Sequence, residues 1–279
     1  MSIESPEIKK EKAKRQEPIV ESGGLVFNDF DVRCFGDAKE ALDEEFEENL
    51  KQTKELVDDI LGSEWKIGDD KLKIHLFSDE DQYKEYLRKN FPKAARGWAT
   101  FDQKTNSVFS CDIIPQGEKT PDIYRVKIFS GVGHEMAHLH PFFGGVGNKA
   151  SKGKWGQEMV CVFVQDKVEA KMGSDLMRSI TMERAKKELE GFKNKERAFS
   201  LKAADTDWEN FYSLERLFYP WLEKKYGMDK LRQLWAMLFR EKKGIGESLK
   251  EIYGEDIDNL EEQFEDEVDK TENYEELVR

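Results

Sequence analysis

In the first third of the chain, segments with apolar residues at every second position alternate with segments that have apolar residues at helical spacing. Residues 25–35 (LVFNDFDVRCF) and residues 71–78 (KLKIHLFS) alternate at every second position, which is typical of strands. Between them, residues 38–61 carry apolar side chains at helical spacing among acids, and Gly62 is a helix stop signal. Residues 81–90 (DQYKEYLRKN) have the same helical pattern. The pattern therefore predicts strand, helix, strand and helix, in this order.

The next segment predicts a hairpin, and the rest of the chain predicts helices. Two short β-type runs flank the polar turn QKTN, so we expect a hairpin at about residues 97–112. Helical patterns follow at residues 123–142 and 154–172, and a loop rich in Gly and Lys separates them at residues 144–153. From about residue 178 to residue 275 the pattern is helical, with breaks expected near Gly191, Pro220, Gly227, Gly244 and Gly254.

These elements predict an α+β fold. We expect a small mixed sheet with helices in the N-terminal half, followed by an all-helical C-terminal half. Residues 24–148 would form the first subdomain, and residues 149–279 would form the second. Residues 1–23 alternate Glu and Lys without an apolar core, which indicates a disordered tail.

Length, charge and cysteine spacing narrow the classes of partner and location. The chain has 279 residues, 38% of them apolar, which is enough to bury a core that excludes water from a site. Its formal net charge of −13 disfavours binding to nucleic acid and to anionic membrane surfaces. No stretch approaches the roughly 20 apolar residues that span a bilayer. The N-terminus lacks the apolar core of a secretory signal and the three cysteines are far apart, so we expect a reducing, cytoplasmic location.

The candidate chemistry lies in the segment GHEMAHLH, residues 133–140, which holds three of the four histidines in the chain. His134 and His138 are four residues apart, so a helix places both imidazoles on one face, within reach of one metal ion. Glu135 lies at the edge of that face, where it can act as a general base on a water molecule. This H-E-x-x-H pattern predicts a zinc site, and the alternative is a pair of core histidines.

A catalytic zinc usually takes three protein ligands, so a third ligand must come from elsewhere in the chain. Glu158 lies 20 residues after His138, on the helix expected after the Gly-rich loop, and a helical hairpin of this length returns it to the level of His138. A lone carboxylate on so apolar a helix is costly unless it is paired or coordinated. We therefore expect Glu158 to be the third ligand. The alternative is a solvent-facing carboxylate at the start of the helix.

The two segments together resemble the gluzincin metallopeptidases, the thermolysin-like, peptidase-MA-like group with two His ligands and one Glu ligand. GHEMAHLH and the W-x-x-E that runs from Trp155 to Glu158 match this group, and the helical tail from Tyr212 onward is similar to its smaller members. The resemblance covers about residues 71–268. It implies a zinc metallopeptidase that hydrolyses peptide (amide) bonds in a peptide or protein substrate, with Glu135 as general base.

The resemblance also implies two further parts of such a site. A Tyr from the C-terminal half would stabilise the developing oxyanion; Tyr212 is the expected residue, and Tyr219 and Tyr124 compete with it. A strand beside the cleft would pair with an extended substrate, and either residues 97–102 or residues 107–112 would be that strand.

Several positions depart from the group. Val162 stands where thermolysin-like enzymes have an acid that orients a ligand His, and Met159 follows Glu158 where the group often has Gly. The G-x-M-E-N motif of the aminopeptidase branch is absent, so an endopeptidase is expected rather than an aminopeptidase. His140 is expected to pack or cap, and His75 is expected to be half-exposed on a strand. A catalytically silent gluzincin-fold module that binds a peptide or protein is the alternative function.

Overall fold

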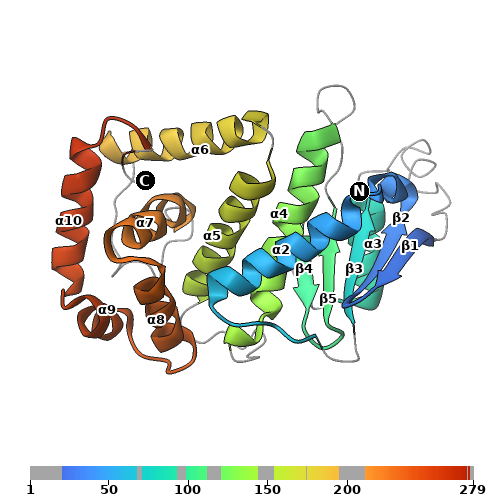
Figure 1. The fold of residues 1–279 in the computed structure, drawn as a ribbon, viewed down its shortest axis with the longest axis horizontal. Helices are drawn as coiled ribbons and strands as arrows, with labels where there is room; N and C mark the ends of the chain where they lie inside the picture. Colours follow the sequence, from blue (N-terminus) through green and yellow to red (C-terminus); the bar gives the residue numbers. More distant parts are fainter. Residues whose placement is uncertain are drawn as a thin grey trace, which may run out of the picture.

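The computed structural model of the chain describes residues 21–67, 71–92, 99–111, 121–143, 154–173, 175–194, 211–274 and 276. A five-stranded sheet lies at one end of the molecule, and the C-terminal helices lie at the other (Figure 1). The fold is therefore α+β, with a small mixed sheet in the N-terminal half and a helical C-terminal half, as the sequence predicts. Most of the expected tail and the expected boundary loop at residues 144–153 lie outside the described residues.

The segment expected as one strand at residues 25–35 is a hairpin. Strand β1 (Glu21–Phe27) turns at Asn28 into strand β2 (Phe30–Phe35), and Phe27 pairs with Phe30 across the turn. Asn28 has a φ of 33°, on the positive side that Asn tolerates better than most residues, so the chain reverses there. Leu25 and Phe27 of β1 pack on the main core, and so do Phe30, Val32 and Cys34 of β2, so the alternation shifts by one residue at the turn. The single-strand prediction is wrong because it overlooks this shift. Strand β1 also begins at Glu21, within the segment expected as a tail.

The sheet has the strand order β1-β2-β3-β5-β4. Strand β3 (Leu72–Phe77) runs parallel to both β2 and β5 (Ser107–Ser110), whereas β1 and β4 (Ala99–Asp102) pair antiparallel at the two edges. The hairpin expected at residues 97–112 is thus confirmed as β4 and β5, and β4 is its edge strand.

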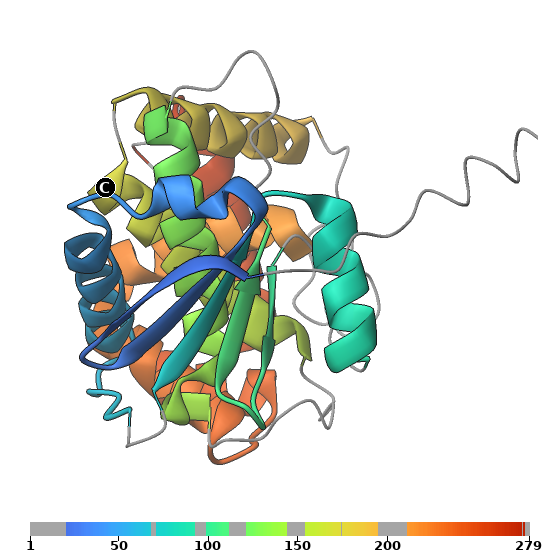
Figure 2. The same cartoon turned by 90° about the vertical axis from the view of Figure 1, so that its right-hand side faces the viewer.

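Side chains alternate between two buried layers along the central strands. Val32, Ile74 and Val108 point into the main core, while Phe35, Phe77 and Phe109 form a second apolar cluster under helix α3 (Glu80–Asn90). The Asp79 carboxylate caps α3 by accepting a hydrogen bond from the Gln82 backbone N–H at 2.7 Å. Helices α2 and α3 flank the sheet on opposite sides (Figure 2).

The helix expected at residues 38–61 begins later than predicted. A 3-10 turn, η1 (Gly36–Ala41), comes first, and helix α2 (Phe46–Leu61) follows. Gly62 ends α2 with a φ of 70°, a left-handed conformation that glycine adopts without steric cost. The amphipathic face of α2 buries Leu50, Val57 and Ile60 in the main core.

Helices α4 (Pro121–Leu139) and α5 (Lys154–Met172) pack against each other more extensively than any other pair of elements. Their course agrees with the helices expected at 123–142 and 154–172, although α4 ends before His140 and a 3-10 turn, η2 (Pro141–Phe143), follows. Both helices lie in the centre of the molecule, between the sheet and the C-terminal helices (Figure 1). The surfaces that carry the candidate ligands thus face each other.

The C-terminal half consists of helices α6 (Asp175–Lys193), α7 (Phe211–Tyr226), α8 (Met228–Phe239), α9 (Ile245–Tyr253) and α10 (Ile257–Lys270). The breaks expected at Gly227, Gly244 and Gly254 are confirmed as helix ends. The break expected near Gly191 agrees with the end of α6 at Lys193, two residues later. The break expected near Pro220 is wrong, because this residue lies inside α7. The buried side chains of Tyr219 and Trp221 hold α7 in place around the proline.

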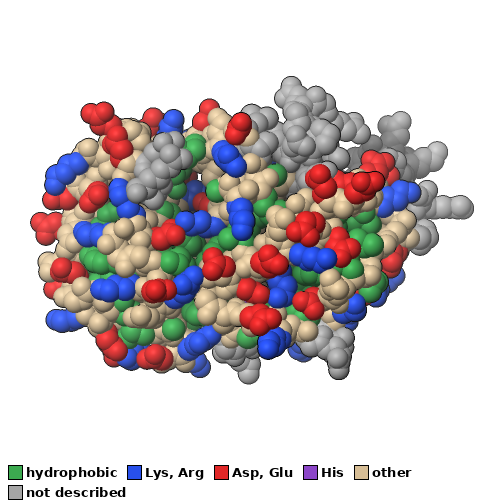
Figure 3. Space-filling model, in the orientation of Figure 1, with side chains coloured by type: hydrophobic (Ala, Val, Ile, Leu, Met, Phe, Trp, Pro, Cys, Tyr) green, Lys and Arg blue, Asp and Glu red, His purple; other side chains and the backbone are tan. Residues whose placement is uncertain are grey.

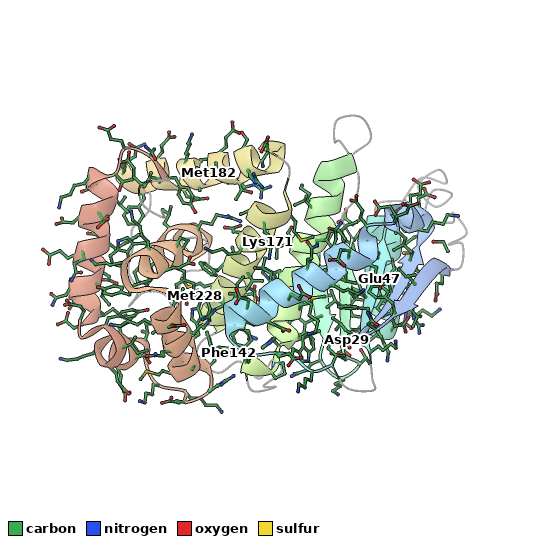
Figure 4. All side chains as sticks on the ribbon, in the orientation of Figure 1. Asp29, Glu47, Phe142, Lys171, Met182 and Met228 are labelled. Carbon is green, nitrogen blue, oxygen red and sulfur yellow. The ribbon has the colours of Figure 1, made fainter. Side chains whose placement is uncertain are left out.

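One apolar cluster extends from the sheet through α4 and α5 to α10. Side chains of α5, α7 and α8 fill the space between these helices (Figure 4). Trp235 contacts both Phe163 and Tyr219, with ring centroids 5.7 Å apart in each pair. Acidic and basic side chains are intermixed on the face seen in Figure 3. None of the described helices combines the length and apolar character that a membrane-spanning segment requires.

Candidate metal centre

Helix α4 places the two histidines of the H-E-x-x-H segment side by side. The ring centroids of His134 and His138 are 5.0 Å apart, with an angle of 63° between the ring planes. This arrangement follows from the spacing of four residues, since side chains four positions apart lie one above the other on a helix. His138 is nearly buried, with 6% of its side chain exposed, and His134 is more open at 15%.

Helix α5 brings the Glu158 carboxylate to both imidazoles. Its Oε2 atom lies 3.4 Å from Nε2 of His134, and its Oε1 atom lies 3.3 Å from Nε2 of His138. Each carboxylate oxygen thus faces a different ring. The Glu158 side chain is 29% exposed, so the group opens to solvent on this side. The structure therefore brings together the three residues that the sequence selects as metal ligands.

The charges within this group depend on one another. Burial alone would raise the pKa of Glu158, but hydrogen bonds from His134 and His138 hold that pKa well below its usual range. Burial alone would lower the pKa of His134, but Glu158 and the nearby Glu135 raise it.

Glu135 is buried beside these rings, with 6% exposure. Burial raises the pKa of its carboxyl, and the charges of His134 and His138 oppose that rise. Glu135 is therefore a base whose proton affinity exceeds that of an ordinary exposed glutamate.

Strand β4 supplies an aromatic wall to the site. Phe101 stacks on the His138 ring, with centroids 4.8 Å apart and an angle of 18° between the planes. Because β4 is at the edge of the sheet, the strand expected to border the site is the one at residues 97–102 rather than that at 107–112. Residues 97 and 98 lie outside the described part of the chain.

Val162 is buried, and its aliphatic side chain cannot form a hydrogen bond with a ligand histidine. The Nδ1 atoms of His134 and His138 are buried without a hydrogen-bond partner among the described residues. Two turns beyond Glu158 on α5, Gln165 adds a contact that raises the pKa of His134. Gln165 is itself held by the buried carboxylate of Glu169, to which its Nε2 donates at 3.3 Å.

Cys161 is a member of the group that sequence reasoning missed. Its Sγ atom and one imidazole nitrogen from each of His134 and His138 all lie within 4.8 Å of one another. The sequence indicates only that Cys161 is a small buried residue, and it is indeed fully buried. The available signal was its position three residues after Glu158, which places both side chains on neighbouring parts of one helix face.

The other two histidines lie away from the site. His140 follows α4, and its Nε2 lies 3.2 Å from Oδ1 of Asp58 and 3.1 Å from the Ser63 carbonyl, so it has the packing role that was expected. His75 was expected to be half-exposed, and this is wrong, because it is only 4% exposed. His75 stacks between Phe35 and Phe109. Helix α3 covers this face of β3, and the alternation of the strand sequence does not reveal that cover.

Of the three candidate oxyanion donors, the structure describes the side chain of Tyr219 only. Tyr219 is buried in the main core, where its ring contacts Phe163 and Trp235. The side chains of Tyr212 and Tyr124 lie outside the described part of the chain, so the expectation for Tyr212 stays a prediction.

Comparison of the chain with models of known protein families gives no match, and comparison with curated proteins gives no match either.

Proposed function

We propose that this chain is a zinc-dependent metallopeptidase that hydrolyses peptide bonds, with His134, His138 and Glu158 as metal ligands and Glu135 as general base. The observation that supports this most is the position of Glu158, whose two carboxylate oxygens face Nε2 of His134 and Nε2 of His138 at 3.4 and 3.3 Å. These residues come from two different helices, α4 and α5, so their meeting is a property of the fold.

The donor set and its spacing fit zinc. Two imidazoles and one carboxylate are a set found in catalytic zinc sites. Two donors that each lie about 2.0–2.1 Å from a tetrahedral ion are roughly 3.3–3.4 Å apart. The separations between Glu158 and the two imidazoles already have this value. His134, His138 and Glu158 would thus hold the cation between the two helices.

Zinc in this place would lower the pKa of the attacking water and polarise the scissile carbonyl. Glu135 would take the proton of that water and deliver it to the leaving nitrogen. The raised pKa of its buried carboxyl favours this role, because a base works best when its pKa is near the working pH. Tyr212, by resemblance to the gluzincins, would donate a hydrogen bond to the oxyanion.

An extended peptide is the substrate class that this site favours. Strand β4 is an edge strand of the sheet, and its Phe101 stacks on the ligand His138. A substrate strand that paired with β4 would therefore pass beside the proposed metal. The absence of a G-x-M-E-N motif favours an endopeptidase. The three cysteines, which are buried and form no disulfide, favour a reducing compartment such as the cytoplasm.

The test combines metal analysis with cleavage of a peptide library by the purified chain. The wild type should hold about one zinc per chain and cleave peptides. Glu135→Gln should keep the zinc and lose cleavage, because the amide cannot accept the proton. His134→Ala should lose the zinc, while His75→Gln, a change outside the site, should keep both properties.

Two results would argue against this function. A wild-type chain without zinc after incubation with the metal would contradict the metal site itself. A zinc-loaded wild type that cleaves no member of the library would contradict hydrolysis and favour the alternative of a silent peptide-binding module.

A further inference from the structure

A sulfur donor lies beside the two ligand histidines. We propose that Cys161 contributes a thiolate to the same cation, so that the centre has two nitrogen donors, one oxygen donor and one sulfur donor. This inference rests on the proposed zinc site, and it adds a ligand that the H-E-x-x-H pattern does not contain.

The geometry places Cys161 beside the two proposed histidine ligands. Its Sγ and an imidazole nitrogen from each of His134 and His138 are mutually within 4.8 Å. Cys161 is on α5, three residues after Glu158, and α5 packs closely on α4 along this stretch. A small inward shift of these side chains would bring three donors to bonding distance of one ion, since zinc binds nitrogen at about 2.0–2.1 Å and sulfur at about 2.3 Å.

The surroundings of this thiol suit a ligand to a cation. The His138 side chain is 94% buried, and Cys161 is fully buried beside it. Little water reaches such a place to compete with the sulfur for a cation.

The other two cysteines provide a contrast within the same chain. Cys34 lies in the main apolar core, and Cys111 lies in the cluster under α3. Among the described residues, Cys161 is the cysteine that lies within 4.8 Å of an imidazole nitrogen of each of two histidines. All three thiols are buried, so burial alone does not distinguish Cys161.

A thiolate changes what the centre can hold and do. On binding, the thiol would lose its proton to solvent, and the charges of Glu158 and Cys161 would together balance those of a divalent cation. A soft donor favours zinc over magnesium, calcium and manganese. With Cys161 bound, the attacking water would be a fifth ligand, an expansion that some catalytic zinc sites make in the transition state.

X-ray absorption at the zinc edge of the full-length, zinc-loaded chain tests this proposal. We expect one sulfur scatterer at about 2.3 Å in addition to nitrogen and oxygen at about 2.0–2.2 Å. Cys161→Ala should lose the sulfur scatterer, whereas Cys34→Ala and Cys111→Ala, which remove equally buried thiols, should retain it.

The wild-type spectrum decides the proposal even if a variant fails to fold. Bound zinc with nitrogen and oxygen scatterers alone would overturn the role of Cys161 and leave the proposed His134, His138 and Glu158 site standing. A sulfur scatterer that persists in Cys161→Ala would also overturn it. A chain that binds no zinc would overturn both this inference and the proposed function.

Discussion

At the scale of single residues, surroundings give the four histidines of this chain different chemistry. His134 and His138 face a carboxylate beside an opening to solvent. His140 directly follows α4, and its imidazole lies at hydrogen-bonding distance from the carboxylate of Asp58 on α2. His75 is enclosed by aromatic rings beneath α3. The proposed metal ligands are thus the two histidines that share one carboxylate.

His75 should make the chain sensitive to acid. Burial, together with the charge of Arg33, lowers its pKa from 6.5 to about 4. As the pH falls, His75 is therefore protonated near pH 6.5 in the unfolded chain but only near pH 4 in the folded chain. The stability due to neutral His75 is fully present above pH 6.5 and should fall by about 1.4 kcal/mol per pH unit below it.

Urea unfolding between pH 4 and pH 7 measures this effect. The free energy of unfolding of wild type should drop more steeply with acid than that of His75→Phe, in which the titrating group is absent. Equal slopes for the two proteins would contradict the assignment of His75 as a buried neutral residue.

At the scale of elements, the sequence predicts this site well because one helix and one spacing determine most of it. The distance of four residues between His134 and His138 requires a shared helix face, and an apolar helix makes an isolated Glu158 conspicuous. The hairpin turn at Asn28 was missed because the shift of the apolar positions between Phe27 and Phe30 is a short break in an otherwise strand-like segment. The position of Cys161 beside the two histidines was missed because its neighbours come from α4, and a local pattern contains no information on that packing.

Gly133 sets the separation of the helices at the site. A Cβ atom at this position would lie 3.1 Å from Cγ2 of Val168 on α5 and 3.2 Å from Cγ2 of Thr53 on α2. Both neighbours are fully buried and branched at Cβ, so they have little room to move. The glycine thus permits α4 to approach α2 and α5 next to His134.

Gly133→Ala should therefore lower the free energy of unfolding. Overpacking costs about 1–3 kcal/mol, and it outweighs the gain of about 1 kcal/mol that alanine brings to a helix. The same change should weaken zinc binding by moving His134 away from Glu158. Thermal unfolding and a zinc titration measure the two effects, with Gly246→Ala as a control, since a Cβ there meets nothing within 4 Å. An unchanged or raised stability of Gly133→Ala would contradict close packing as its role.

At the scale of the whole molecule, the candidate site lies where the two halves of the fold meet. Helix α4 packs on the strands of the sheet, while α5 packs on α6 and α7. A cation held by His134, His138 and Glu158 would therefore connect the sheet-bearing half to the helical half. The continuous apolar core joins the same two halves, so the site lies on a rigid support.

Zinc should accordingly stabilise the entire fold. A ligand that binds only the folded chain adds about 2.7 kcal/mol when its concentration is 100 times its dissociation constant. The midpoint of thermal unfolding should rise on addition of zinc and fall on addition of a chelator. Glu158→Ala should remove most of this response. If zinc leaves the melting temperature of the wild type unchanged, this result would contradict a metal shared by the two halves.

The most direct measurement is anomalous X-ray diffraction at the zinc absorption edge from crystals of the zinc-loaded chain. The account predicts one strong peak within about 2.0–2.2 Å of Nε2 of His134, Nε2 of His138 and a carboxylate oxygen of Glu158. A map without a peak between α4 and α5, in crystals grown with zinc in excess, would contradict it.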